Sequence, residues 1–168
     1  MSITDELPIP VKKMIIASDG YLDLKMYAEA REELLLVPRK YRKHSMYLWM
    51  MNRLSVDTGD WETAVTASHS LWEAHPDLVA TWVAYAYAVR RHENIVTARN
   101  ILLQAIEQFH EEAIIPYNLA CYECTLGNSE KAKRYLKHAF SLDTSFRAIA
   151  LEDEDLITLR DEINLWQE

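Results

Sequence analysis

Small and apolar residues recur along the chain at intervals of 34 residues. Four alanines stand one interval apart: Ala30, Ala64, Ala98 and Ala132. Seven residues after each alanine comes a further small or aliphatic residue, in the series Val37, Leu71, Ala105 and Ala139. Twelve residues before each alanine comes a short side chain, in the series Ser18, Asn52, Ala86 and Ala120. A fixed interval of this length indicates structural units that stack on one another.

Each interval has the spacing of two helices. Short side chains let two helix backbones approach closely, and the bulkier residues around them fill the remaining space. Asp60, Asn94 and Asn128 each precede a helical run, in the position of an N-cap residue. The pattern predicts eight helices, over residues 11–24, 27–37, 45–57, 60–74, 79–91, 94–109, 113–125 and 129–142.

The end of the sequence predicts a further helix with one apolar face. Leu156, Leu159, Ile163 and Trp166 recur at helical spacing, and an acidic run over residues 152–155 suits the start of a helix. A stack of repeats ends on an apolar edge that needs a cover. We therefore expect a capping helix over about residues 152–166. An acidic interaction tail is the alternative, although a free tail has no need of an apolar stripe.

The period and the residues that carry it resemble the tetratricopeptide repeat (TPR), a helix–turn–helix unit. The best-matching unit has Leu119, Ala120, Gly127, Ala132 and Leu136 at the family's positions. Lys25 and Glu93 replace the turn glycine of two other units. The resemblance covers about residues 11–143 and extends to small bacterial TPR proteins, including their Asp-rich closing segment.

The resemblance implies an all-α fold, a right-handed α-solenoid of about four TPR units with a C-terminal capping helix. It implies one TPR domain over residues 1–168, with repeats at about 11–44, 45–78, 79–112 and 113–146.

Composition agrees with a helical protein and argues against several other classes. Only 3 Gly and 5 Pro in 168 residues favour a few long elements over a strand-rich fold. A formal net charge of −8 disfavours a nucleic-acid partner. No run approaches the roughly 18 apolar residues of a membrane span, and the N-terminal residues lack a signal-peptide pattern. We therefore expect a cytoplasmic protein that binds neither nucleic acid nor membrane.

The sequence offers no convincing catalytic or metal signature. Cys121 and Cys124 form a CxxC motif without a second pair, so we interpret them as packing residues, with a metal or redox role as the alternative. The six histidines make no paired metal spacing. Phosphate-binding glycine loops and nucleophile motifs are absent from the sequence. We expect no enzyme, no cofactor and no metal.

A basic stretch joins the first two predicted repeats. It contains Arg39, Lys40, Arg42, Lys43, His44 and Arg53. A solvated loop is one interpretation of these charges, and contact with an acidic partner is the other. The overall charge of −8 disfavours RNA binding by this stretch.

The resemblance also implies where a partner binds. In the family, the first helix of each repeat lines a concave groove. The corresponding positions supply our candidate peptide-binding residues: Trp49, Arg53, Tyr87, Arg90, Tyr117 and Asn118. Trp, Tyr and Arg are the side chains enriched at binding hot spots. If instead a neighbouring segment fills the groove, these residues belong to the core.

We therefore expect an adaptor or scaffold that binds a peptide or a partner helix in the groove. The alternative is a secretion-type TPR chaperone for a dedicated protein substrate, which would be a homodimer.

Overall fold

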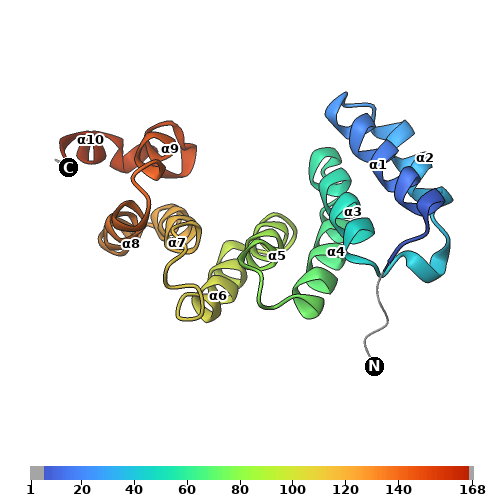
Figure 1. The fold of residues 1–168 in the computed structure, drawn as a ribbon. Coiled ribbons are helices and arrows are strands. Elements are labelled where there is room, and N and C mark those ends of the chain that lie inside the picture. Colours follow the sequence, from blue (N-terminus) through green and yellow to red (C-terminus); the bar gives the residue numbers. More distant parts are fainter. Residues whose placement is uncertain (1–5, 167–168) are drawn as a thin grey trace. The chain divides into compact units, whose positions relative to one another are not determined.

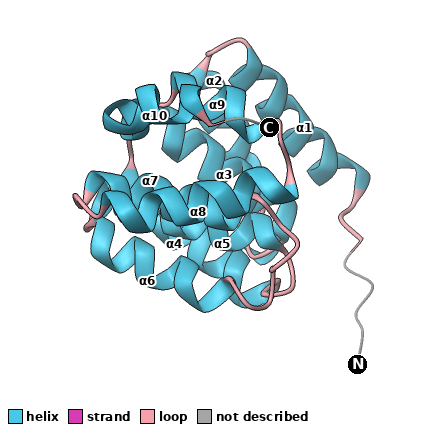
Figure 2. Cartoon of the chain, turned by 90° about the vertical axis from the view of Figure 1, so that its left-hand side faces the viewer, coloured by secondary structure: helices cyan, strands magenta, loops and turns pink. Residues whose placement is uncertain are grey.

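The computed structural model describes residues 6–166, and every regular element in that range is a helix. Figure 2 shows helices joined by loops, with no strand among the described residues. The chain divides between Pro76 and Asp77 into two compact units, which we call unit 1 (Met1–Pro76) and unit 2 (Asp77–Glu168) and describe separately. The single domain expected over residues 1–168 stays a prediction.

Unit 1 consists of two helix pairs (Figure 1). Helices α1 (Ile9–Asp23) and α2 (Tyr27–Leu36) form the first pair, and α3 (Ser45–Thr58) and α4 (Trp61–Ala74) form the second. A short 3-10 helix, η1 (Arg39–Tyr41), lies in the connection between the pairs. Because α3 contacts both α1 and α2, the two pairs share one apolar interior.

Unit 2 contains two further pairs and a C-terminal segment (Figure 1). Helix α5 (Val79–His92) pairs with α6 (Ile95–Ala105), and α7 (Ile114–Thr125) pairs with α8 (Ser129–Leu142). Helix α9 (Phe146–Glu152), the 3-10 helix η2 (Glu154–Leu159) and α10 (Arg160–Leu165) follow. The all-α fold of successive helix pairs is thus confirmed, and no helix within residues 6–166 has the length and apolar character needed to span a bilayer.

The recurring small residues are the most deeply buried positions of both units. Every alanine of the first series, Ala30, Ala64, Ala98 and Ala132, has an exposed fraction of 0%. The series that follows seven residues later is also buried completely, as are Ser18, Ala86 and Ala120. The 34-residue columns therefore mark where helix backbones lie against each other, as the sequence predicts.

The predicted N-cap residues stand at helix starts, but they do not all cap in the same way. The Asp60 carboxylate accepts a hydrogen bond from the Thr63 amide at 3.2 Å, and the Asn94 side chain accepts one from Thr97 at 2.8 Å. Asn128 occupies the N-cap position of α8 without a side-chain cap. The side-chain amide of Asn128 instead donates to the Glu123 carboxylate at 2.6 Å.

Two predicted helices differ from the structure. Helix α6 ends at Ala105 instead of residue 109, and the turns that follow bring Phe109 edge-on against Trp82, with ring centroids 6.5 Å apart. The capping helix expected over 152–166 is divided at Asp153, whose backbone is extended (φ −73°, ψ 125°). The Asp153 side chain accepts a hydrogen bond from the Asp155 amide and so begins η2 as a separate element.

The apolar stripe of the C-terminal segment is nevertheless buried. Leu156, Leu159 and Ile163 are 0–2% exposed, because a 3-10 helix has three residues per turn and places residues 156 and 159 on one face. Trp166 packs edge-on against Phe140 of α8, with ring centroids 6.0 Å apart. The segment therefore covers the last helix pair, although it is not one continuous helix.

Enlarging an alanine of the buried column should destabilise the protein. We expect Ala98→Leu and Ala132→Leu each to lower the free energy of unfolding by about 1–3 kcal/mol, because added methyl groups have no space between close-packed helices. Urea unfolding followed by circular dichroism measures the change. The control is Ala80→Leu, the same substitution at an exposed position of α5. Equal stability of all three variants would contradict close packing at this column.

Replacing Lys25 by glycine should stabilise the protein. Lys25, Gly59 and Gly127 lie at equivalent turns and all have a positive φ, of 58°, 72° and 79°. A side chain in this left-handed conformation costs about 1–2 kcal/mol, of which glycine's extra entropy in the unfolded chain offsets part. We expect Lys25→Gly to raise the free energy of unfolding by about 0.5–1 kcal/mol, measured by urea unfolding. Lys13→Gly, at an exposed site within α1, should lower it; a loss of stability in both variants would contradict strain at Lys25.

Candidate functional site

The candidate residues of unit 1 lie on α3, where one of them is bound to α1. Arg53 donates to the Asp19 carboxylate and, at 2.6 Å, to that of Asp23. Asp19 and Arg53 are one 34-residue period apart, so they occupy equivalent positions on neighbouring first helices. The Arg53 side chain remains 37% exposed and Trp49 is half-buried. Because Trp49 and Arg53 are four residues apart on α3, one helix face carries both an indole ring and a fixed guanidinium.

The candidate residues of unit 2 fall into two groups. Tyr87 is 39% exposed, and Asn118 is half-buried and donates its side-chain amide to the Ile114 carbonyl at 2.8 Å. Arg90 and Tyr117, in contrast, both bind the C-terminal segment of the same chain.

Carboxylates of the C-terminal segment make these contacts. Arg90 donates two hydrogen bonds to the two oxygens of Asp155, at 2.5 and 2.6 Å, in the bidentate geometry that favours a guanidinium. The Tyr117 hydroxyl donates to Asp153 at 2.7 Å, and the Tyr117 ring lies 4.9 Å from that of Phe146. We call this set of contacts between residues 153–159 and α5 and α7 the C-terminal latch.

The two cysteines of the CxxC motif lie beneath the latch. Cys121 is 3% exposed with its Sγ 3.6 Å from Asp153, and Cys124 is 8% exposed with its Sγ 3.3 Å from the Thr158 hydroxyl. Burial, together with the charges of Asp153 and Asp155, raises the pKa of the Cys121 thiol, so it stays protonated at neutral pH.

Cys121, Asp153 and Asp155 offer three metal-ligand atoms within 4.8 Å of one another. Arg90 already occupies both oxygens of Asp155 and brings its own positive charge. The group is therefore arranged as two hydrogen-bonded contacts, in which Arg90 binds Asp155 while Tyr117 and Cys121 donate to Asp153.

Part of the basic stretch has a structural role. Arg42 donates to the carbonyls of Val37 and Leu35, at 2.9 and 2.8 Å, and so satisfies acceptors at the end of α2. The His44 ring accepts a hydrogen bond from the Met46 amide at the start of α3. These two residues fix the connection between the pairs of unit 1, whereas Arg39, Lys40 and Lys43 are exposed.

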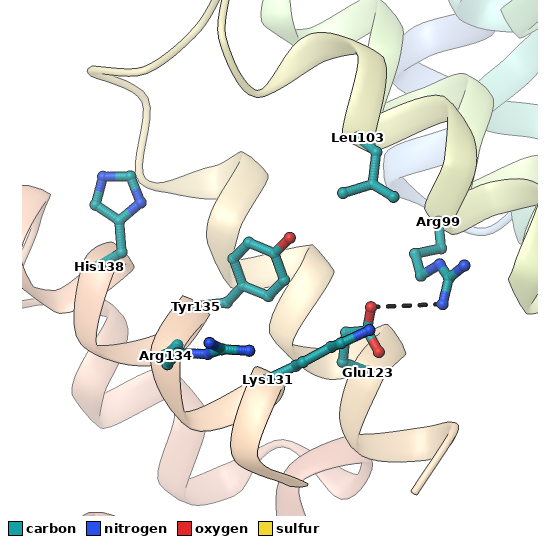
Figure 3. A pocket seen from close by; sticks show the side chains of 7 residues that line it. All are labelled: Arg99, Leu103, Glu123, Lys131, Arg134, Tyr135 and His138. Atoms are coloured by element: carbon teal, nitrogen blue, oxygen red, sulfur yellow. Dashed lines mark hydrogen bonds and ion pairs between the residues drawn. The ribbon is translucent and has the colours of Figure 1, made fainter. Parts of the chain in front are cut away.

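A pocket of about 500 Å³ lies in unit 2, and none of the candidate residues lines it (Figure 3). Helix α6 supplies one wall, α8 the opposite wall, and α7 contributes a single acidic residue. The lining consists of Arg99, Leu103, Glu123, Lys131, Arg134, Tyr135 and His138.

The only carboxylate of this lining is buried and bound. Glu123 is 2% exposed; Arg99 lies 3.5 Å from one of its oxygens and Asn128 2.6 Å from the other. Burial raises the pKa of Tyr135, so its hydroxyl remains a donor at neutral pH. Sequence reasoning missed this pocket because it considered only first helices. The available signal was the spacing of Lys131, Arg134 and His138, which puts three basic side chains on one face of α8.

Solved structures with the same arrangement of helices identify the fold. A MamA structure matches with a TM-score of 0.71 and 15% identity, over 92% of this chain and 86% of that one. MamA 41-end from Desulfovibrio magneticus RS-1 matches with a TM-score of 0.71 and 13% identity, over 84% and 78% of the two chains. MamA is a tetratricopeptide-repeat protein. The fold of this chain is a TPR fold. No family model matches the sequence, and no curated protein does either.

The TPR fold clarifies what the latch does. Arg90, Tyr117 and both cysteines belong to first helices, the same helices that carry the other candidate residues. In unit 2 a segment of the chain itself contacts this face. Binding to a partner remains a prediction for all six candidate residues. Because Arg90 and Tyr117 already bind the C-terminal segment, they can contact a partner only after residues 153–159 move away.

Weakening the latch should expose the buried thiols. We expect Asp153→Asn/Asp155→Asn to increase the reaction rate of Cys121 and Cys124 with a thiol reagent at pH 8 by about tenfold, because a loss of about 1.4 kcal/mol in latch stability raises the open population by that factor. Time-resolved absorbance with Ellman's reagent measures the rate. The matched control, Glu152→Gln/Glu154→Gln, removes the same charge from exposed positions of the same segment. Equal rates in the two variants would contradict the latch.

Proposed function

We propose that this protein is an adaptor or scaffold that binds a segment of a partner protein along the exposed faces of its first helices. Stacked helix pairs bury one face against their neighbours and leave extended surfaces for recognition. The TPR fold supports an interaction role in general, and the identity of the partner is a separate question.

One observation supports the first-helix face as the binding surface. The first helices of unit 2 already hold a peptide segment, residues 153–159, through paired side-chain contacts from Arg90 and Tyr117. Neighbouring first helices therefore present donors at a spacing that suits a bound chain. The same face outside the latch carries Tyr87, and its counterpart in unit 1 carries Trp49 and Arg53.

Trp49 and Tyr87 are the proposed anchors. Each combines a large apolar surface with a polar tip, and each has only two side-chain torsions to immobilise on binding. Arg53 is held in place by Asp19 and Asp23, so it loses little conformational freedom when a partner contacts its exposed third. Asn118 offers its side-chain oxygen to a partner backbone, since its amide group already donates within α7.

Removing Tyr87 should weaken partner binding without affecting the fold. After the partner is co-purified from native cells and identified, isothermal titration with the purified pair measures affinity. We expect Tyr87→Ala to weaken binding about 30-fold, which corresponds to the roughly 2 kcal/mol of a hot-spot aromatic, and Trp49→Ala to act similarly. The controls are Val96→Ala on α6 and Leu36→Ala on α2, at positions 44% and 61% exposed.

Thermal unfolding of each variant separates binding from stability. Lost affinity with an unchanged melting temperature supports the proposed surface. A lowered melting temperature with unchanged affinity makes Trp49 and Tyr87 core residues, and the proposal is then wrong.

A further inference from the structure

The pocket between α6 and α8 concentrates positive charge in a chain of net charge −8. Arg99, Lys131 and Arg134 contribute three permanent cations against one carboxylate, Glu123. Across residues 6–166, Lys131 and Arg134 make no ion pair, and both side chains are exposed. An acidic protein that gathers two uncompensated cations in one concave site creates a local attraction for anions.

Arg99 retains unused hydrogen-bonding capacity at this site. Its contacts to Glu123 and to the Asn100 side chain are both long, at 3.5 Å, whereas Arg90 binds Asp155 at 2.5 and 2.6 Å. The Arg99 Nε is buried and has no hydrogen-bond partner within residues 6–166. A guanidinium has five N–H donors, so Arg99 can hold Glu123 and still donate to a ligand.

We propose that this pocket binds an acidic segment of a partner protein, through its aspartate or glutamate carboxylates. Lys131 and Arg134 supply the charge that attracts the segment, and the Tyr135 hydroxyl supplies a neutral donor. Figure 3 shows Lys131 and Arg134 on the same side of the pocket as Tyr135, with Leu103 and Arg99 opposite them. The inference rests on the proposed function in one respect only, that the partner is a protein. The surfaces differ, because the pocket is formed mainly by second helices and the proposed function concerns first helices.

The chemistry of the lining favours a peptide over other anions. Leu103 and the Tyr135 ring give the pocket an apolar wall for side-chain methylenes and backbone, which a free inorganic anion does not use. The C-terminal latch gives a precedent in the same unit, since Arg90 and Tyr117 bind two aspartates of an acidic segment.

Fluorescence anisotropy with the full-length protein tests the inference. The probe is a fluorescein-labelled octapeptide of alternating Asp and Glu, at 0.15 M salt, and the neutral counterpart alternates Asn and Gln. We expect the acidic peptide to bind and the neutral one to bind at least tenfold more weakly. Lys131→Glu/Arg134→Glu should lower the affinity for the acidic peptide at least tenfold. Arg99 is left unchanged because its loss would leave the buried Glu123 without its cation.

A matched control separates the pocket from overall charge. Lys13→Glu/Arg31→Glu makes the same change in net charge at exposed positions of α1 and α2, and we expect it to alter affinity less than threefold. Equal weakening by the two double variants would overturn the proposal in favour of general electrostatics. Absence of binding to the unsubstituted protein would also overturn it. Displacement of the peptide by inorganic phosphate at equal concentration would make the pocket a small-anion site instead.

The proposed function and this inference fail separately. Tyr87→Ala should leave acidic-peptide binding unchanged, because Tyr87 is not part of the pocket lining. If Lys131→Glu/Arg134→Glu abolishes peptide binding while Tyr87→Ala has no effect on any partner, the pocket stands and the first-helix surface does not.

Discussion

Close approach of helix backbones at one recurring alanine is the constraint on which the structure depends. Ala30, Ala64, Ala98 and Ala132 are buried completely, so each second helix can lie directly against the first helix of its pair. Within each unit, a pair formed in this way buries one face and leaves an apolar edge, which the second pair of that unit covers. The polar surfaces between these contacts are then free to differ from one repeat to the next.

The last helix pair needs a different cover, and the C-terminal segment provides it. Leu156, Leu159 and Ile163 supply the buried apolar contact. The hydrogen bonds of Asp153 to Tyr117 and of Asp155 to Arg90 fix the orientation of the segment, since they determine which of its residues face α7 and α5. At the far end of the segment, Lys133 of α8 binds Glu162 at 2.7 Å. Apolar burial thus holds the segment, while charged contacts on both sides set its register.

The sequence predicts the helix pairs well because their packing depends on residues at a fixed interval. It fails where a local contact competes with that pattern. Asp153 has the spacing of a helical residue, but its carboxylate serves as the cap of η2, so the helix is interrupted there. Helix α9 is not visible as a pattern, since only Ala150 of its residues is buried.

The candidate sites follow from the same distinction. Asp19, Arg53, Tyr87 and Cys121 lie at successive 34-residue intervals, so the period gives each of them an equivalent position on a first helix. Their surroundings are not periodic: Arg53 meets Asp19 of the preceding first helix, and Cys121 lies 3.6 Å from Asp153 of the C-terminal segment. The pocket on α6 and α8 is further from the pattern, because residues of three helices form it. In such a fold the repeated residues position the backbone. The side chains that differ from one repeat to the next then determine what each surface can contact.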